Sequence, residues 1–172
     1  NIDDAHTGVK TIFKSKDTAD KLAEKGMMFS SANSINWGRL APQIIYYVST
    51  YAQLVADGEI ELGDKINIVV PTGNFGNILA GYYAKHMGVP VNKLICASNA
   101  NNVLTDFIKT GVYDRNRPFH TTISPSMDIL ISSNLERLLY HLSGSDDAQI
   151  REWFGSLSKT GRYEVTDEVK KA

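Results

Sequence analysis

The apolar residues of the chain follow two spacings, which predict alternating helices and strands. One long segment has apolar residues at steps of three and four, from Leu40 through Tyr47 to Leu54, and predicts a helix over residues 37–56. Short runs of consecutive apolar or β-branched residues, bounded by Gly, Asp or Pro, predict buried strands. The predicted strands cover residues 27–30, 65–71 and 94–97. The other predicted helices cover residues 5–25, with Asp3 and Asp4 as caps, and residues 78–87, 101–109, 133–142 and 148–157.

Strand, loop, helix, strand, helix is the order typical of parallel α/β proteins. We therefore predict a single domain over residues 1–172, a three-layer α/β/α arrangement with part of a parallel sheet and helices on both faces. Ligands of such sheets bind at the carboxyl ends of the strands. Two polar loops lie there, residues 31–36 and residues 72–77. A long polar loop is predicted over residues 111–127, and long loops inside a domain are often functional.

Residues 71–77, Pro-Thr-Gly-Asn-Phe-Gly-Asn, are the more informative loop. Gly73 and Gly76 lie in a strand-to-helix turn, where glycine lets the backbone adopt left-handed angles and approach a ligand closely. The amides at the start of the next helix carry positive partial charge, so the loop suits an anion, most naturally a phosphate. It lacks the Gly-Lys-Ser/Thr ending of a P-loop and the Gly-x-Gly-x-x-Gly of dinucleotide-binding proteins. A tight turn with Asn77 as the helix cap is the alternative that these residues leave open.

Residues 31–39, Ser-Ala-Asn-Ser-Ile-Asn-Trp-Gly-Arg, form a second polar segment ahead of an apolar helix. Arg39 lies one turn into that helix, near its positive end, where an arginine fork suits a phosphate or a carboxylate. The alternative is that Ser34 or Asn36 only caps the helix. Capping and ligand contact are compatible, so both interpretations stay open.

Composition excludes several classes of protein. The chain has 172 residues and one cysteine, which rules out a disulfide framework or a Cys-rich zinc site. Its 18 Lys and Arg against 19 Asp and Glu argue against a nucleic-acid partner. The apolar runs are too short to span a membrane, and the polar start is unlike a signal peptide, so we expect a cytoplasmic protein. The start without Met indicates a piece of a longer protein.

The other candidate residues carry weaker signals. The four histidines lack the spacing of metal ligands, and His120, in the long loop, is the strongest of them. Cys96 lies in a predicted strand and is expected to pack as a small apolar residue. Residues 124–128 fit either a ligand loop or a turn. The charged tail over residues 164–172 is predicted to be a solvated helix end.

Several of these segments, taken in order, resemble the threonine synthase family, which are pyridoxal-phosphate (PLP) enzymes of the tryptophan-synthase-β type. The resemblance covers nearly the whole chain apart from its C-terminal end. The matching segments are residues 31–39, 42–47, 70–77, 84–90, 100–107 and 124–137, and Asp3-Asp4 and Val9-Lys10 also fit.

The resemblance implies a PLP fold type II enzyme of threonine biosynthesis. In that reaction O-phosphohomoserine and water give threonine and phosphate, and PLP serves as the electron sink. The residues that the resemblance assigns to the PLP phosphate are Gly73, Asn74, Phe75, Gly76 and Asn77. Those that it assigns to the phosphorylated substrate are Asn33, Ser34, Asn36 and Arg39, with Arg39 facing the substrate phosphate.

The family also has a lysine that this chain does not match. It lies in a Ser-Phe-Lys-Asp motif well upstream of the asparagine-serine loop. The nearest string here, residues 13–17, has the wrong order and lies in a polar helix, so we do not expect Lys16 to be the Schiff-base lysine. The chain is therefore expected to be a central fragment of the enzyme, inactive by itself.

Two alternatives stay open. One is another PLP-dependent lyase of the same superfamily, such as a serine or threonine dehydratase or a cysteine synthase. Arg39 in the asparagine-serine loop favours a phosphorylated substrate over these. The other is a non-catalytic domain that binds a phosphorylated ligand or has a structural role. The oligomeric state does not follow from the sequence.

Overall fold

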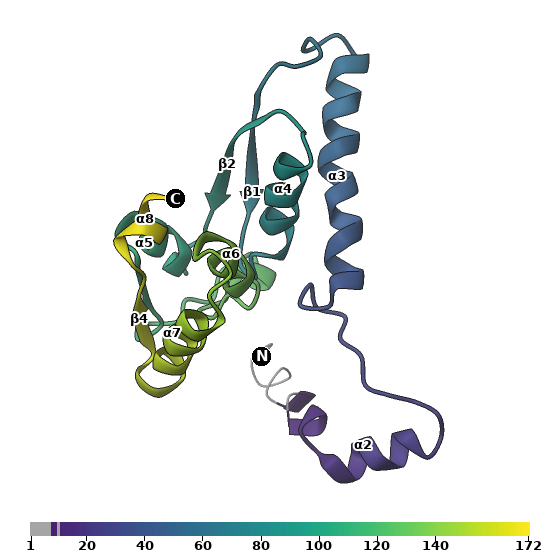
Figure 1. The fold of residues 1–172 in the computed structure, drawn as a ribbon, viewed down its shortest axis with the longest axis vertical. Helices are drawn as coiled ribbons and strands as arrows, with labels where there is room; N and C mark the ends of the chain where they lie inside the picture. The colour runs from purple at the N-terminus through teal and green to yellow at the C-terminus, as the bar shows by residue number, and fades with distance from the viewer. Residues whose placement is uncertain (1–7, 10) are drawn as a thin grey trace.

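A computed structural model describes residues 8, 9 and 11–172, and its centre is a pair of parallel strands beside a set of helices (Figure 1). The elements are α2 (Lys16–Ala23), α3 (Trp37–Ala56), β1 (Ile66–Pro71), α4 (Gly76–His86), β2 (Val91–Ala97), α5 (Val103–Thr110), β3 (Val112–Asp114), the 3₁₀ helix η1 (Pro125–Met127), α6 (Leu135–Leu142), α7 (Asp147–Thr160), β4 (Arg162–Glu164) and α8 (Asp167–Lys171).

The unit β1–α4–β2 confirms the predicted α/β fold. Strands β1 and β2 pair in parallel, and Pro71 lies opposite Ala97 at their carboxyl ends. Helix α4 is largely buried between this pair and α3, and Leu79 is fully buried. The two helices approach closely because Gly81 has no side chain: a Cβ there would lie 2.7 Å from the ring of Tyr47. On the sheet, Val70 is buried whereas its neighbour Val69, which points to the opposite face, is 61% exposed.

A second, smaller sheet forms where the sequence predicted a loop and a solvated tail. Strand β3 begins inside the predicted loop over residues 111–127 and pairs antiparallel with β4. Tyr113 and Tyr163 are partners in this register, and their buried rings stack with centroids 5.2 Å apart. Val165 and Val169, which follow β4, are also buried. The tail over residues 164–172 does contain the predicted helix end, α8, but it is not wholly solvated, because Val165 and Val169 pack against the core.

The N-terminal predictions are only partly correct. The helix expected over residues 5–25 is interrupted at Lys14 and Ser15, and α2 begins afresh at Lys16 because the Ser15 hydroxyl accepts from the Thr18 amide. The strand expected over residues 27–30 does not form: these residues pair with no strand among the described residues, and Met28 is 87% exposed. The proposed caps at residues 3 and 4 lie outside the described residues. Figure 1 shows α2 apart from the sheet, and none of its residues is buried.

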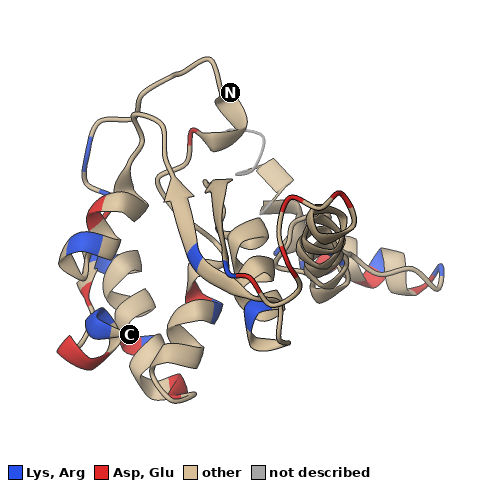
Figure 2. Ribbon diagram, turned by 90° about the horizontal axis from the view of Figure 1, so that it is seen from above, with Lys and Arg blue, Asp and Glu red and all other residues tan. Residues whose placement is uncertain are grey.

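Charged residues are spread over the periphery of the fold. Figure 2 shows basic and acidic segments interspersed on the helices and loops. Arg39 is the single charged residue within α3. None of the described helices combines the length and apolar character needed to cross a membrane.

Candidate functional site

The loop over residues 72–77 connects the carboxyl end of β1 to the start of α4. Thr72 continues the strand pairing, because its amide donates to the Ala97 carbonyl at 2.8 Å. Phe75 then adopts a left-handed conformation with φ of +65°, which is uncommon for a residue with a side chain, and its buried ring anchors the turn in the core. Asn77 does not cap α4. It lies within the first turn, where its backbone and side-chain oxygens both accept from the Tyr47 hydroxyl.

Six successive amides in this segment are available for an anion. The backbone N–H groups of residues 73–78 donate to no described residue, and the first intrahelical bond runs from Leu79 to the Phe75 carbonyl. Gly73 and Gly76 are nevertheless buried. Buried amides without an acceptor are costly, and those at a helix start carry positive partial charge. The loop therefore has the chemistry of a phosphate site.

Both glycines of this loop are required by close contacts. A Cβ on Gly73 would lie 3.0 Å from Ile129 Cδ1 and 3.3 Å from Met127 Cα. A Cβ on Gly76 would lie only 2.6 Å from the Cβ of Ser34. The loop is thus packed between residues 126–129, at the end of η1, and the asparagine-serine loop, residues 31–36, both of which are distant in the sequence.

The asparagine-serine loop, residues 31–36, lies against residues 72–77, which we call the phosphate-type loop. Hydrogen bonds from its own side chains fix its conformation. Asn36 caps α3, since its Oδ1 accepts from the Gly38 amide at 2.9 Å. Asn33 Oδ1 accepts from the Ile35 amide at 3.0 Å. The capping interpretation of Asn36 is therefore correct.

Gln43, one of the residues in the matching segment 42–47, links the two loops. Its Nε2 donates to Ser34 Oγ at 2.9 Å, and its Oε1 accepts from Asn77 Nδ2 at 3.2 Å. Arg39 is exposed beside them. Its Nε donates to the Ala32 carbonyl at 3.1 Å, and its two terminal nitrogens donate to no described residue.

Sequence reasoning assigned no role to the segment Ser132–Arg137, which holds both loops by their carbonyl oxygens. Ser132 Oγ donates to the Gly73 carbonyl at 2.8 Å. Asn134 donates to the Asn74 carbonyl twice, from its backbone amide at 3.1 Å and from Nδ2 at 3.0 Å. Arg137 donates to the carbonyls of Ser34, at 2.8 Å, and Ile35.

A signal for this segment existed in the sequence. Ser-Ser-Asn directly before an apolar helix is typical of an N-cap, yet the Asn134 side chain makes no capping bond to α6. It is fully buried and directed at the phosphate-type loop instead. Only a contact across 60 positions of sequence reveals this role.

The loop after β2 lies beside the phosphate-type loop because β1 and β2 end at the same edge. Side-chain hydrogen bonds join this loop to residues 120–128, where Asp128 is buried and accepts from the Thr122 amide at 2.8 Å and from Asn99 Nδ2 at 2.7 Å. These donors, the Thr122 amide first, hold the pKa of the Asp128 carboxyl below its usual value. Asn101 bonds the backbone amide and carbonyl of His120. The exposed His120 ring takes no part in this network of contacts.

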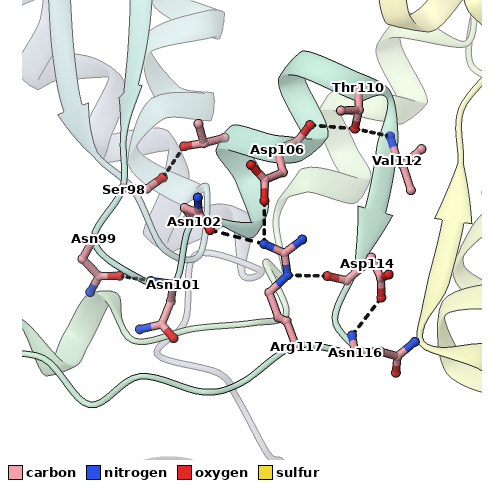
Figure 3. Close-up of polar contacts among 11 residues, drawn as sticks. Ser98, Asn99, Asn101, Asn102, Asp106, Thr110, Val112, Asp114, Asn116 and Arg117 are labelled. Carbon is pink, nitrogen blue, oxygen red and sulfur yellow. Dashed lines mark hydrogen bonds and ion pairs between the residues drawn. The ribbon is translucent and has the colours of Figure 1, made fainter.

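Arg117 fastens the same region from outside, as Figure 3 shows. Its Nη1 pairs with Asp106 Oδ2 at 2.7 Å and its Nε donates to the Asp114 carbonyl at 2.9 Å. Nη1 also reaches Asn102 Oδ1 at 3.3 Å. Arg117 therefore ties the start of α5 to the end of β3 and limits the movement of the loop after β2.

Two other sequence candidates lie outside this site. Lys16 is exposed at the start of α2, which Figure 1 shows apart from the carboxyl end of the sheet. Cys96 is half-buried in β2 and packs against the apolar core, and burial raises the pKa of its thiol. Among the described residues, no cluster of His, Cys, Asp or Glu could hold a metal ion.

Comparison with known proteins identifies the relatives of this chain. No family model matches it. Threonine synthase-like 1 of Homo sapiens is 50% identical over 167 residues, 96% of this chain and 22% of its own length. Threonine synthase of Saccharomyces cerevisiae is 39% identical over 177 residues, 98% of this chain and 33% of its own length.

A solved structure agrees with these relatives. The PLP-bound threonine synthase of Brucella melitensis superposes with a TM-score of 0.85 at 38% identity, over 99% of this chain and 34% of that one. The present chain spans about a third or less of the length of the relatives that it matches. It is therefore a homologue of the threonine synthases that corresponds to one segment of them, and it has the fold of that segment.

Proposed function

We propose that this chain supplies the phosphate-binding part of a PLP site in a threonine synthase. The observation that carries the proposal is the row of amides over residues 73–78, which have no acceptor among the described residues although Gly73, Phe75, Gly76 and Ile78 are buried. The assigned residues Gly73, Asn74, Phe75, Gly76 and Asn77 line this row. A phosphate there would satisfy amides that the fold leaves without partners.

The asparagine-serine loop is proposed to bind the phosphorylated substrate. Its Ser34 lies against Gly76 of the phosphate-type loop, and we propose that Asn33 and Asn36 bind the substrate with it. The free end of the Arg39 guanidinium can pair with a second phosphate. Two adjacent anion sites suit a phosphorylated cofactor beside a phosphorylated amino acid. This is the feature that favours O-phosphohomoserine over the unphosphorylated substrates of other PLP-dependent lyases.

For the whole protein we propose conversion of O-phosphohomoserine and water to threonine and phosphate. Bound PLP supplies the electron sink, and the residues of this chain bind and orient the two phosphates. The Schiff-base lysine is proposed to lie outside these 172 residues, because no Ser-Phe-Lys-Asp motif occurs in them. We further propose that residues 1–172 form one unit of the larger PLP-binding region, in a cytoplasmic protein that has neither nucleic acid nor membrane as a partner.

Calorimetric titration with PLP and with pyridoxal, which lacks the phosphate, tests the cofactor site. We expect PLP to bind at least about tenfold more tightly, since charge-assisted bonds from several amides exceed 1.4 kcal/mol. Equal affinities would refute the proposal. Titration with O-phosphohomoserine tests the substrate loop: Arg39→Ala should weaken binding, whereas Arg162→Ala, an exposed arginine on β4, should not.

An assay of phosphate release tests the expected lack of activity. The chain mixed with PLP and O-phosphohomoserine should release phosphate no faster than the uncatalysed mixture, since the Schiff-base lysine is proposed to lie outside it. Turnover at the rate of an ordinary enzyme would contradict this and would direct attention back to Lys16.

A further inference from the structure

We propose that Ser132 and Asn134 are positioning residues that set the direction of the phosphate-binding amides. Arg137 in turn holds the asparagine-serine loop at a fixed position beside these amides. This inference rests on the proposed function and deepens it, since none of these three side chains is itself assigned a contact with cofactor or substrate. It follows from the backbone carbonyl oxygens to which the segment Ser132–Arg137 donates hydrogen bonds.

The argument starts from the planarity of the peptide bond. In a trans peptide the carbonyl of one residue and the amide of the next lie in one plane and point in opposite directions. Ser132 Oγ holds the Gly73 carbonyl at 2.8 Å, and this bond fixes the direction of the Asn74 amide. The two bonds from Asn134 to the Asn74 carbonyl fix the direction of the Phe75 amide in the same way.

The strained conformation of Phe75 supports this inference independently. Its φ of +65° costs free energy for a non-glycine residue and persists only where the surroundings impose it. The peptide directly before Phe75 is the one that Asn134 holds by two bonds. The segment thus maintains a turn that the local sequence does not favour, and this turn lies in the middle of the amide row.

The supports of the phosphate-type loop are themselves rigid. The Ser132 amide donates to the Tyr113 hydroxyl at 2.9 Å, and that hydroxyl donates to the Leu130 carbonyl at 2.9 Å. Ser132 and Asn134 are 3% and 0% exposed, so water does not compete for their bonds. A preset amide row binds an anion without first paying to order the loop, which strengthens binding.

Arg137 extends the same arrangement to the second loop. Its guanidinium donates to the carbonyls of Ser34 and Ile35, and Ser34 is the residue that contacts Gly76. One segment therefore holds carbonyls of both loops from behind. The spacing between the two proposed phosphate positions depends on it.

The test compares Ser132→Ala and Asn134→Ala with Ser143→Ala as the matched control. The Ser143 hydroxyl also donates to a backbone carbonyl, that of Tyr140 at 3.1 Å, but it lies away from both loops. The measurement is the ratio of pyridoxal to PLP dissociation constants. Ser132→Ala removes the one described donor to the Gly73 carbonyl, so we expect this ratio to fall about threefold to tenfold. Asn134→Ala leaves the backbone donor to Asn74 in place and should lower the ratio less. Ser132→Thr, which keeps the hydroxyl, should restore it.

Two outcomes separate failure of this inference from failure of the proposed function. If wild type prefers PLP and Ser132→Ala keeps that preference while losing stability, the residue is merely structural and the inference is overturned. If wild type shows no preference for PLP, the proposed function fails, and amide hydrogen exchange of Asn74 and Phe75 still decides the positioning role. Faster exchange at these amides in Ser132→Ala than in Ser143→Ala supports the role, and equal exchange overturns it.

Discussion

The contact between Gly76 and Ser34 makes a quantitative prediction about the junction of the two loops. In Gly76→Ala the new Cβ would lie 2.6 Å from Ser34 Cβ and 2.7 Å from Ser34 Oγ. Carbon atoms pack at about 3.5–4.0 Å, so the two loops must separate by about 1 Å. Overpacking of a buried site costs about 1–3 kcal/mol. We expect a loss of unfolding free energy in this range, because the gain in helix propensity at the first residue of α4 is smaller.

The substitution Ser34→Gly removes both clashing atoms and provides the reciprocal test. Alone it should cost about 0.5–1.5 kcal/mol, since Gln43 loses the acceptor Ser34 Oγ. In this background Gly76→Ala should cost little, because the nearest remaining atom, Asn134 Nδ2, lies at an ordinary 3.4 Å. The double-mutant cycle should therefore give a coupling of about 1–2 kcal/mol between the two positions.

Urea unfolding of the four proteins measures this coupling. Gly155→Ala is the matched control, since it lies within α7 with nothing within 4 Å of an added Cβ, and it should stabilise the chain by up to about 1 kcal/mol. An equal cost of Gly76→Ala in the wild-type and Ser34→Gly backgrounds would refute the direct contact. The two loops would then not share the junction on which the proposed pair of phosphate sites depends.

Three further predictions concern the supports of the site. Burial raises the pKa of Tyr113 from 10.0 to about 12, so the unfolding free energy of the wild type should fall as pH rises through this interval. Tyr113→Phe should make this fall smaller and should lower the unfolding free energy by about 1–3 kcal/mol at neutral pH. Because the folded-state pKa of Asp128 lies below 3.8, its stabilisation is present above that pH and is lost on further acidification; urea titrations across acid pH should show a shallower loss for Asp128→Asn. Thermal and urea unfolding should show a loss of about 2–5 kcal/mol for Leu79→Ala, which is fully buried, but a change within about 0.5 kcal/mol for Ile45→Ala, which is 64% exposed.

Local pattern was enough to predict the elements that carry their own signals. Helix α3 has the predicted bounds, and β1 lies within the predicted 65–71, because helical spacing and a β-branched run do not depend on distant residues. The run at residues 27–30 has a similar local pattern but no strand beside it among residues 8, 9 and 11–172, and Met27 and Met28 stay exposed. Strands β3 and β4 were missed because three residues carry too little pattern, and the pairing depends on Tyr113 meeting Tyr163.

The two loops of the candidate site followed from the sequence, but their supports did not. Glycines in a strand-to-helix turn and polar residues before a helix are local features. The bonds from Ser132 to Gly73 and from Arg137 to Ser34 join residues 59 and 103 positions apart, and no local spacing encodes them. Resemblance to a family marked the segment Ser132–Arg137 without explaining it. Its function became visible only through the carbonyl oxygens that it holds.

The long-range hydrogen bonds from the segment Ser132–Arg137 affect the order in which the site assembles during folding. The unit β1–α4–β2 closes over a short stretch of sequence, whereas the bonds to the two loops require closure over 59 and 103 residues. Long-range closure costs more chain entropy and forms more slowly. We therefore expect the sheet unit to form first and the amide row to reach its final geometry last, when α6 docks. A peptide of residues 66–86 alone would contain every residue of the phosphate-type loop and still lack its shape.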